Sequence, residues 1–121
     1  MRISELQTLC HNNSKAAGWY TDLKTGLPLE PSMEVKGLKI SLIHSEISEA
    51  LEGERKNLMD DHIPTRKMAE VELADAIIRI LDYAGFVGYD VEGAIIEKIA
   101  YNQYRPDHKI ENRVLEGGKA F

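Results

Sequence analysis

The chain has 121 residues, a length that suits one domain built on a single hydrophobic core. Apolar residues make up 43% of the chain and charged residues 29%, a globular composition that excludes a disordered or collagen-like protein. The net charge of −5 argues against binding to duplex nucleic acid, because proteins of that class carry a basic surface for the phosphates. We therefore expect a single domain over residues 1–121.

The N-terminal part of the chain combines a short helix with a long loop. A helix is predicted from Ile3 to Ala17. The segment Gly18–Ser32 is rich in Gly, Pro, Thr and Asp and has Trp19 and Tyr20 near its start. Loops of this length are often lids or binding segments, although some are only connectors. From Met33 to Arg55, apolar residues recur at three- and four-residue steps, which predicts an amphipathic helix.

Two further helices complete the predicted fold. Pro64 is expected to begin a helix whose stripe from Met68 to Leu81 is apolar almost all round, so this helix should be central. Asp90 is expected to cap a last helix, which Pro106 ends. No run of residues predicts strands, and the fold class we predict is an all-α, four-helix-type bundle.

The compartment can be predicted from the cysteine content and the hydropathy. Cys10 is the only cysteine and cannot form an intramolecular disulfide, which suits the cytoplasm. The first residues lack the apolar stretch of a signal peptide, and no apolar run approaches the ~18 residues of a membrane span. We expect a cytoplasmic protein with no membrane association.

Two pairs of acidic residues are the most informative feature of the sequence. Glu46 and Glu49 are three residues apart on one predicted helix, and Glu72 and Asp75 are three apart on the next. Such residues are neighbours on a helix surface, and antiparallel packing of the two helices would bring both pairs to one place. Four uncompensated carboxylates there would repel one another. A divalent cation would resolve that conflict, although surface acids in solvent show the same spacing.

The ligand type narrows the choice of cation. Oxygen-only ligands suit Mg²⁺, Mn²⁺ or Ca²⁺, and Mg²⁺ also shares its coordination shell with substrate phosphates. Di-iron bundles need Glu-x-x-His pairs. None of the four histidines, His11, His44, His62 and His108, has an acidic residue three positions before it. Di-iron chemistry is therefore set aside.

A polar face on the last predicted helix is either an ordinary solvated face or, beside a metal site, a source of cations for an anionic ligand. Lys98, Asn102 and Arg105 follow one another at steps of four and three residues, with Tyr101 beside them. Lys and Arg bind phosphate, and Asn hydrogen-bonds a phosphate, sugar or base. Trp19 or Tyr20 is a candidate to stack on a base, and the alternative role for such an aromatic residue is to anchor the loop to the core. We interpret His44 and Arg79, which lie near the acidic motifs, as polar partners of the acids.

Three segments resemble one family in chain order. Ser45–Leu51, Glu72–Asp75 and Lys98–Pro106 are similar to the motifs of the MazG-like, all-α nucleoside triphosphate pyrophosphohydrolases. The motif-bearing core covers about residues 33–108, and the loop over 18–32 resembles the segment before the first motif in small MazG-like proteins of bacteria and phages. Many members carry a further Glu at the position of Ser45, so the number of metal ions stays open.

The resemblance implies an enzyme that cleaves a nucleoside triphosphate to the monophosphate and pyrophosphate. Glu46, Glu49, Glu72 and Asp75 would bind Mg²⁺, with Mn²⁺ as a substitute, and Glu46 or Glu49 would be the general base. Lys98, Asn102 and Arg105 would contact the nucleotide, and the protein would be a homodimer or homotetramer. The alternatives are a non-catalytic nucleotide- or metal-binding module and a purely structural helical adaptor.

Overall fold

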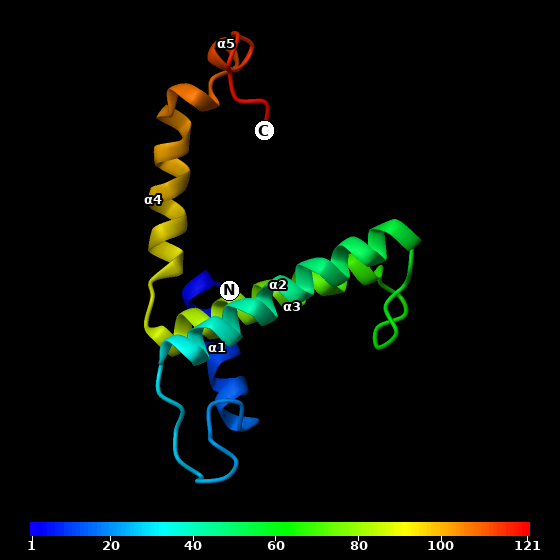
Figure 1. Cartoon of the computed structure of the whole chain (residues 1–121), viewed down its shortest axis with the longest axis vertical. Helices are drawn as coiled ribbons and strands as arrows, with labels where there is room; N and C mark the ends of the chain where they lie inside the picture. Colours follow the sequence, from blue (N-terminus) through cyan, green and yellow to red (C-terminus); the bar gives the residue numbers. More distant parts are fainter. The chain divides into compact units, whose positions relative to one another are not determined.

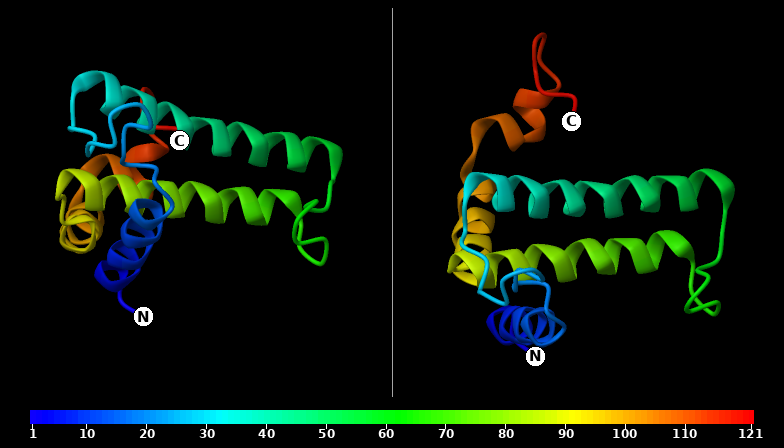
Figure 2. Two further views of the ribbon diagram at one scale, coloured as in Figure 1. Left: turned by 90° about the horizontal axis from the view of Figure 1, so that it is seen from below. Right: turned by 60° about the horizontal axis from the view of Figure 1, so that its bottom comes forward.

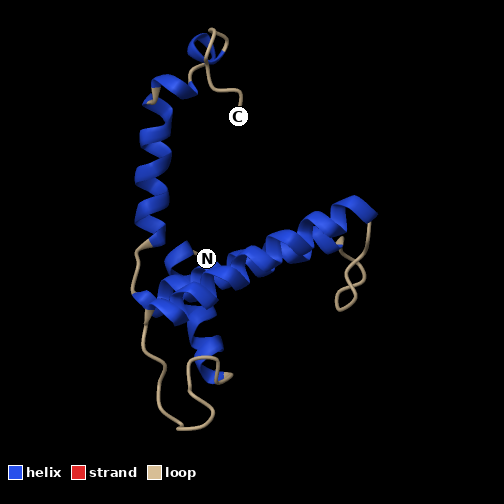
Figure 3. Cartoon of the chain, in the orientation of Figure 1, coloured by secondary structure: helices blue, strands red, loops and turns tan.

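The computed structural model describes all 121 residues, and its regular elements are helices (Figures 1 and 3). They are α1 (Ile3–Ala16), α2 (Met33–Lys56), α3 (Met68–Val87), α4 (Val91–Tyr104), the 3-10 helix η1 (Pro106–His108) and α5 (Ile110–Arg113). The predicted all-α class is confirmed. The chain divides into two compact units, residues 1–89 and residues 90–121. None of the helices combines the length and the apolar character that a membrane crossing requires.

Helix α3 is the centre of the first unit, as its nearly all-round apolar pattern predicts. Figure 2 shows α2 and α3 running antiparallel side by side, with α1 against another face of α3. The buried residues between the helices are mostly small, among them Ala50, Ala69 and Ala76. This composition lets the backbones of α2 and α3 approach closely. It also leaves large apolar side chains of α3 exposed, including Leu73 and Ile77.

Close packing and polar contacts join α1 to α3. Gly85 permits the approach, because a Cβ atom there would lie 2.6 Å from the Cβ of His11. The buried carboxylate of Asp82 accepts a hydrogen bond of 2.9 Å from the hydroxyl of Ser14 and lies 3.0 Å from Nδ1 of His11. Tyr20 packs its ring on His11, with 4.9 Å between the ring centroids. The long loop is therefore held to the helices at its first residues.

Local capping explains where α2 begins and ends. The side chain of Ser32 accepts a hydrogen bond from the N–H of Val35, which caps the first turn. Asn57 ends the helix in the left-handed conformation, with φ of 50°. The predicted helix over residues 33–55 is confirmed.

The start of α3 differs from the prediction. The helix begins at Met68, four residues after Pro64. The intervening loop has its own hydrogen bonds, because the buried carboxylate of Asp60 accepts from the N–H groups of His62 and Ile63. These contacts satisfy backbone donors without helix formation, and Pro64 belongs to a turn.

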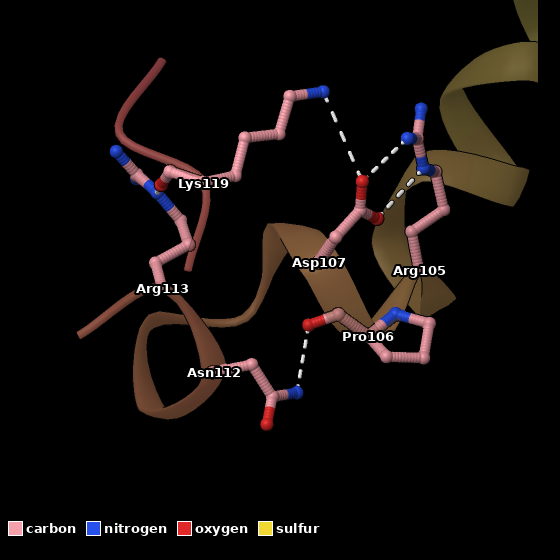
Figure 4. Close-up of polar contacts among 6 residues, drawn as sticks. All are labelled: Arg105, Pro106, Asp107, Asn112, Arg113 and Lys119. Carbon is pink, nitrogen blue, oxygen red and sulfur yellow. Dashed lines mark hydrogen bonds and ion pairs between the residues drawn. The ribbon is translucent and has the colours of Figure 1, made fainter. Parts of the chain in front are cut away.

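The second unit contains the predicted last helix. The side chain of Asp90 caps α4 by accepting a hydrogen bond from the N–H of Gly93. The helix ends at Tyr104 because Arg105 precedes a proline and is extended. After η1, the short helix α5 is tied back by a hydrogen bond of 2.7 Å from Asn112 to the carbonyl of Pro106 (Figure 4).

Candidate metal and phosphate site

The antiparallel packing of α2 and α3 brings the two acidic pairs together. Carboxylate oxygens of Glu46, Glu72 and Asp75 all lie within 4.8 Å of one another. Glu49 hydrogen-bonds to Glu72 and lines the same cavity of about 340 Å³. We call these four residues the carboxylate cluster. The structure thus places all four predicted metal ligands around one cavity.

Crowding shifts the pKa values of the cluster in opposite directions. For Glu72, burial and hydrogen bonds to Glu46 and Glu49 raise the pKa to about 8. Burial and the charge of Glu46 raise the pKa of Asp75. Burial alone would also raise the pKa of Glu46, but hydrogen bonds from Glu72 and Arg79 outweigh it and hold that pKa below its usual value. The crowding therefore disfavours ionisation of all four carboxylates at once in the metal-free protein.

Arg79 is the cation that compensates the buried acid. Its Nε–H donates a hydrogen bond of 2.7 Å to Glu46, whose side chain is only 10% exposed. The interpretation of Arg79 as a polar partner of the acids is confirmed. His44 is exposed.

The donor set of the cluster fits a hard divalent cation. Its ligand atoms are carboxylate oxygens, which Mg²⁺ and Mn²⁺ prefer, and the neighbouring cavity leaves space for water and phosphate oxygens. Burial, and after it the neighbouring acids, raise the pKa values of Glu72 and Asp75, so both groups are costly to ionise without a cation. A bound cation would stabilise the ionised form of both groups.

The loop between α2 and α3 adds residues that sequence reasoning missed. Asp60, His62 and Ile63 line the same cavity as the carboxylate cluster. They lie between the two predicted helices, before the expected start at Pro64, so no periodicity related them to the acids. The run Asp60-Asp61-His62, which only Ile63 separates from Pro64, was the available signal, because Asp commonly begins a turn.

A second and larger cavity adjoins the cluster. Its volume is about 480 Å³, and Glu46 and Asp75 line both cavities. Trp19 lines the larger one, with 67% of the residue exposed, whereas the neighbouring Tyr20 is buried. Of the two aromatic residues in the loop, Tyr20 therefore anchors and Trp19 is available to a ligand. Sequence reasoning missed Lys39, which also lines this cavity.

Two of the predicted phosphate-binding residues lie over one aromatic ring in the second unit. Nζ of Lys98 lies 4.6 Å from the ring centroid of Tyr101, and the guanidinium carbon of Arg105 lies 5.7 Å from it. Arg105 also donates two hydrogen bonds, of 3.0 and 2.6 Å, to Asp107 (Figure 4). The side-chain oxygen of Asn102 is buried without a hydrogen-bond partner. Lys98, Tyr101 and Arg105 thus form one group, and Asn102 on α4 carries an acceptor without a partner.

Comparisons with protein families, with curated proteins and with solved structures find no significant match to this chain. The MazG-like resemblance therefore stays a prediction from the three motifs.

Proposed function

We propose that the protein is a Mg²⁺-dependent nucleoside triphosphate pyrophosphohydrolase, which hydrolyses the bond between the α- and β-phosphates. The observation that carries the proposal is the meeting of Glu46, Glu72 and Asp75 within 4.8 Å, at the boundary of two cavities. One cavity holds the remaining acid, Glu49, and the other holds an exposed tryptophan and cations. Such a site suits a cation, a phosphate chain and a base together.

The residues of the cluster take different roles in this proposal. Glu46, Glu72 and Asp75 hold the metal ion, which when bound neutralises phosphate charge and lowers the pKa of water. Glu49 accepts the proton of the attacking water, because it is exposed at the cavity while Glu46 is occupied by Arg79. Mn²⁺ would support the reaction in place of Mg²⁺, because both ions prefer oxygen ligands.

The cationic residues of the second unit bind the nucleotide in this proposal. Lys98 and Arg105 stabilise charge on the phosphates, and Asn102 and Tyr101 contact the substrate. The partnerless oxygen of Asn102 supports a ligand that carries a hydrogen-bond donor.

We further propose a homodimer or homotetramer in the cytoplasm. Support for self-association comes from exposed apolar side chains on α3, of which Leu73 is 50% and Ile77 53% exposed. The single cysteine, Cys10, supports a reducing compartment because it has no disulfide partner in the chain.

The test is release of pyrophosphate from a panel of ribo- and deoxyribonucleoside triphosphates, with Mg²⁺, with Mn²⁺ and with excess chelator. We expect metal-dependent formation of monophosphate and pyrophosphate. Glu72→Gln should lower kcat by at least about 100-fold, because it removes a charge that the bound metal requires. Glu70→Gln is the matched control, since Glu70 lies on the same helix, is exposed and pairs with Arg66.

Two results would contradict the hydrolase proposal. If the Glu72→Gln variant were as active as the Glu70→Gln variant, the carboxylate cluster would not take part in the reaction. Binding of nucleotide without turnover by the wild-type protein, across the whole panel, would favour the non-catalytic binding module instead. Unchanged helicity of both variants by circular dichroism separates loss of activity from loss of fold.

A further inference from the structure

The larger cavity of the first unit contains cations that the metal site does not use. It is lined by Lys39 from α2, by Arg79 from α3 and by Trp19 from the loop. Lys39 lies seven residues before Glu46, so the two share a face of α2 about 10 Å apart along the helix axis. That separation is comparable with the length of an extended triphosphate.

Lys39 is fixed in place without a carboxylate partner. Its ammonium donates a hydrogen bond of 3.3 Å to the carbonyl of Trp19 and lies 4.2 Å from the ring centroid of Tyr20. No carboxylate lies within salt-bridge distance of it. The buried acid on the same cavity wall, Asp82, is already bonded to His11 and Ser14. Lys39 therefore retains N–H donors for an anion.

Arg79 supplies a second positive charge to the same cavity. Its hydrogen bond to Glu46 uses Nε, and a guanidinium carries four further N–H donors. Burial lowers the pKa of Lys39; the charge of Asp82 opposes this effect and the charge of Arg79 adds to it. An anion bound between the two cations would compensate this electrostatic cost.

We propose that Lys39 and Arg79 form a subsite for the phosphate chain of a nucleoside triphosphate whose base stacks on Trp19. This inference rests on the proposed function, because it places the substrate of that reaction against the carboxylate cluster. It assigns the phosphate contacts of the first unit to residues outside all three motifs. Base stacking fits the exposed indole, since such contacts need only a flat aromatic face.

The single tryptophan of the chain makes the subsite measurable. Fluorescence of Trp19 is followed while α,β-methylene nucleoside triphosphates, which resist the proposed cleavage, are added with Mg²⁺. We expect these analogues to quench the emission of the wild-type protein. Inorganic tripolyphosphate, which has no base, should displace them without quenching of its own.

Substitutions at one position distinguish a phosphate contact from a structural role. Lys39→Gln should weaken analogue binding about tenfold, equivalent to about 1.4 kcal/mol. Lys39→Arg should retain the affinity within about threefold, because the positive charge stays in the cavity. Lys24→Gln is the control, since Lys24 is an exposed loop residue outside both cavities. Circular dichroism and thermal melting check that the Lys39 variants are folded.

The outcomes separate the subsite from the reaction. Analogue affinity in Lys39→Gln equal to that in Lys24→Gln would overturn the subsite, and so would binding that leaves Trp19 emission unchanged. If the wild type shows Lys39-dependent binding but releases no pyrophosphate, the hydrolase proposal fails and the subsite stands. If turnover occurs and Lys39→Gln leaves KM unchanged, the subsite fails and the reaction stands. Supporting kinetics are a KM raised about tenfold with kcat within about twofold.

Discussion

Removing the guanidinium of Arg79 tests whether the carboxylate cluster is an electrostatically crowded site. In Arg79→Gln, Glu46 loses the hydrogen bond of 2.7 Å and the positive charge that compensates it. The acid stays buried, with only 8% of the residue exposed, and remains beside Glu72 and Asp75. We therefore expect the metal-free variant to be destabilised, and the pKa of Glu46 to rise.

The expected decrease in the free energy of unfolding depends on how far the Arg79–Glu46 pair is buried. A hydrogen bond to a charged group contributes about 1.5–3 kcal/mol to stability. The Arg79 side chain is 42% exposed, so water screens part of this interaction, and we expect a loss near the lower end, about 1.5 kcal/mol. The matched control is Arg66→Gln, because the Arg66–Glu70 pair is more than half exposed on both sides and contributes about 0.3–0.5 kcal/mol.

Urea denaturation at pH 8 with chelator measures both variants. The free energy of unfolding should fall by about 1 kcal/mol more in Arg79→Gln than in Arg66→Gln, with unchanged dependence on urea concentration. As pH falls through the lowered pKa of Glu46, the difference should shrink, because protonation of this carboxylate removes the charge that Arg79 compensates. Equal losses in the two variants at pH 8 would refute the claim that Glu46 depends on Arg79.

Two other predictions concern the metal-free protein and the helix packing. Because the pKa of Glu72 is raised from 4.5 to about 8, its contribution to stability is fully present below pH 4.5 and is lost as pH rises through about 8. In chemical denaturation, Glu72→Gln should therefore flatten the dependence of the unfolding free energy on pH between these values. A pH dependence as steep as that of the wild type would contradict the assignment. Gly85→Ala should destabilise the fold by about 1–3 kcal/mol, because the new Cβ would lie 2.6 Å from that of His11. The matched variant Gly37→Ala meets no atom within 4 Å and should stabilise α2 by about 0.5–1 kcal/mol, so thermal melting should separate the two in sign.

The helices and the meeting of the acidic pairs could be predicted because both follow from periodicity. Apolar residues at three- and four-residue steps predicted α2 to within a residue of its end at Lys56. The same geometry put Glu46 beside Glu49 and Glu72 beside Asp75, and an antiparallel pair of helices was enough to bring them together.

The loop contributions could not be predicted in the same way. Proline is common at the first position of a helix, which is why Pro64 was expected to begin one. The hydrogen bonds from the backbone to Asp60 hold that segment as a turn instead, and α3 starts later. Likewise, Lys39 belongs to none of the sequence motifs, and it differs from other helical lysines only in the residues that surround its side chain. Those neighbours come from α3 and the long loop, which a pattern along α2 does not encode.

The two acids of the first pair show how tertiary contacts assign roles that spacing leaves open. Glu46 and Glu49 are equivalent by pattern, and each was a candidate for the general base. Packing of α2 on α3 turns Glu46 toward Arg79 and buries it, while Glu49 stays exposed at the cavity. A buried carboxylate with a depressed pKa holds a cation well and accepts a proton poorly. The proposed roles, with Glu46 as metal ligand and Glu49 as general base, therefore depend on which face of α2 packs against α3.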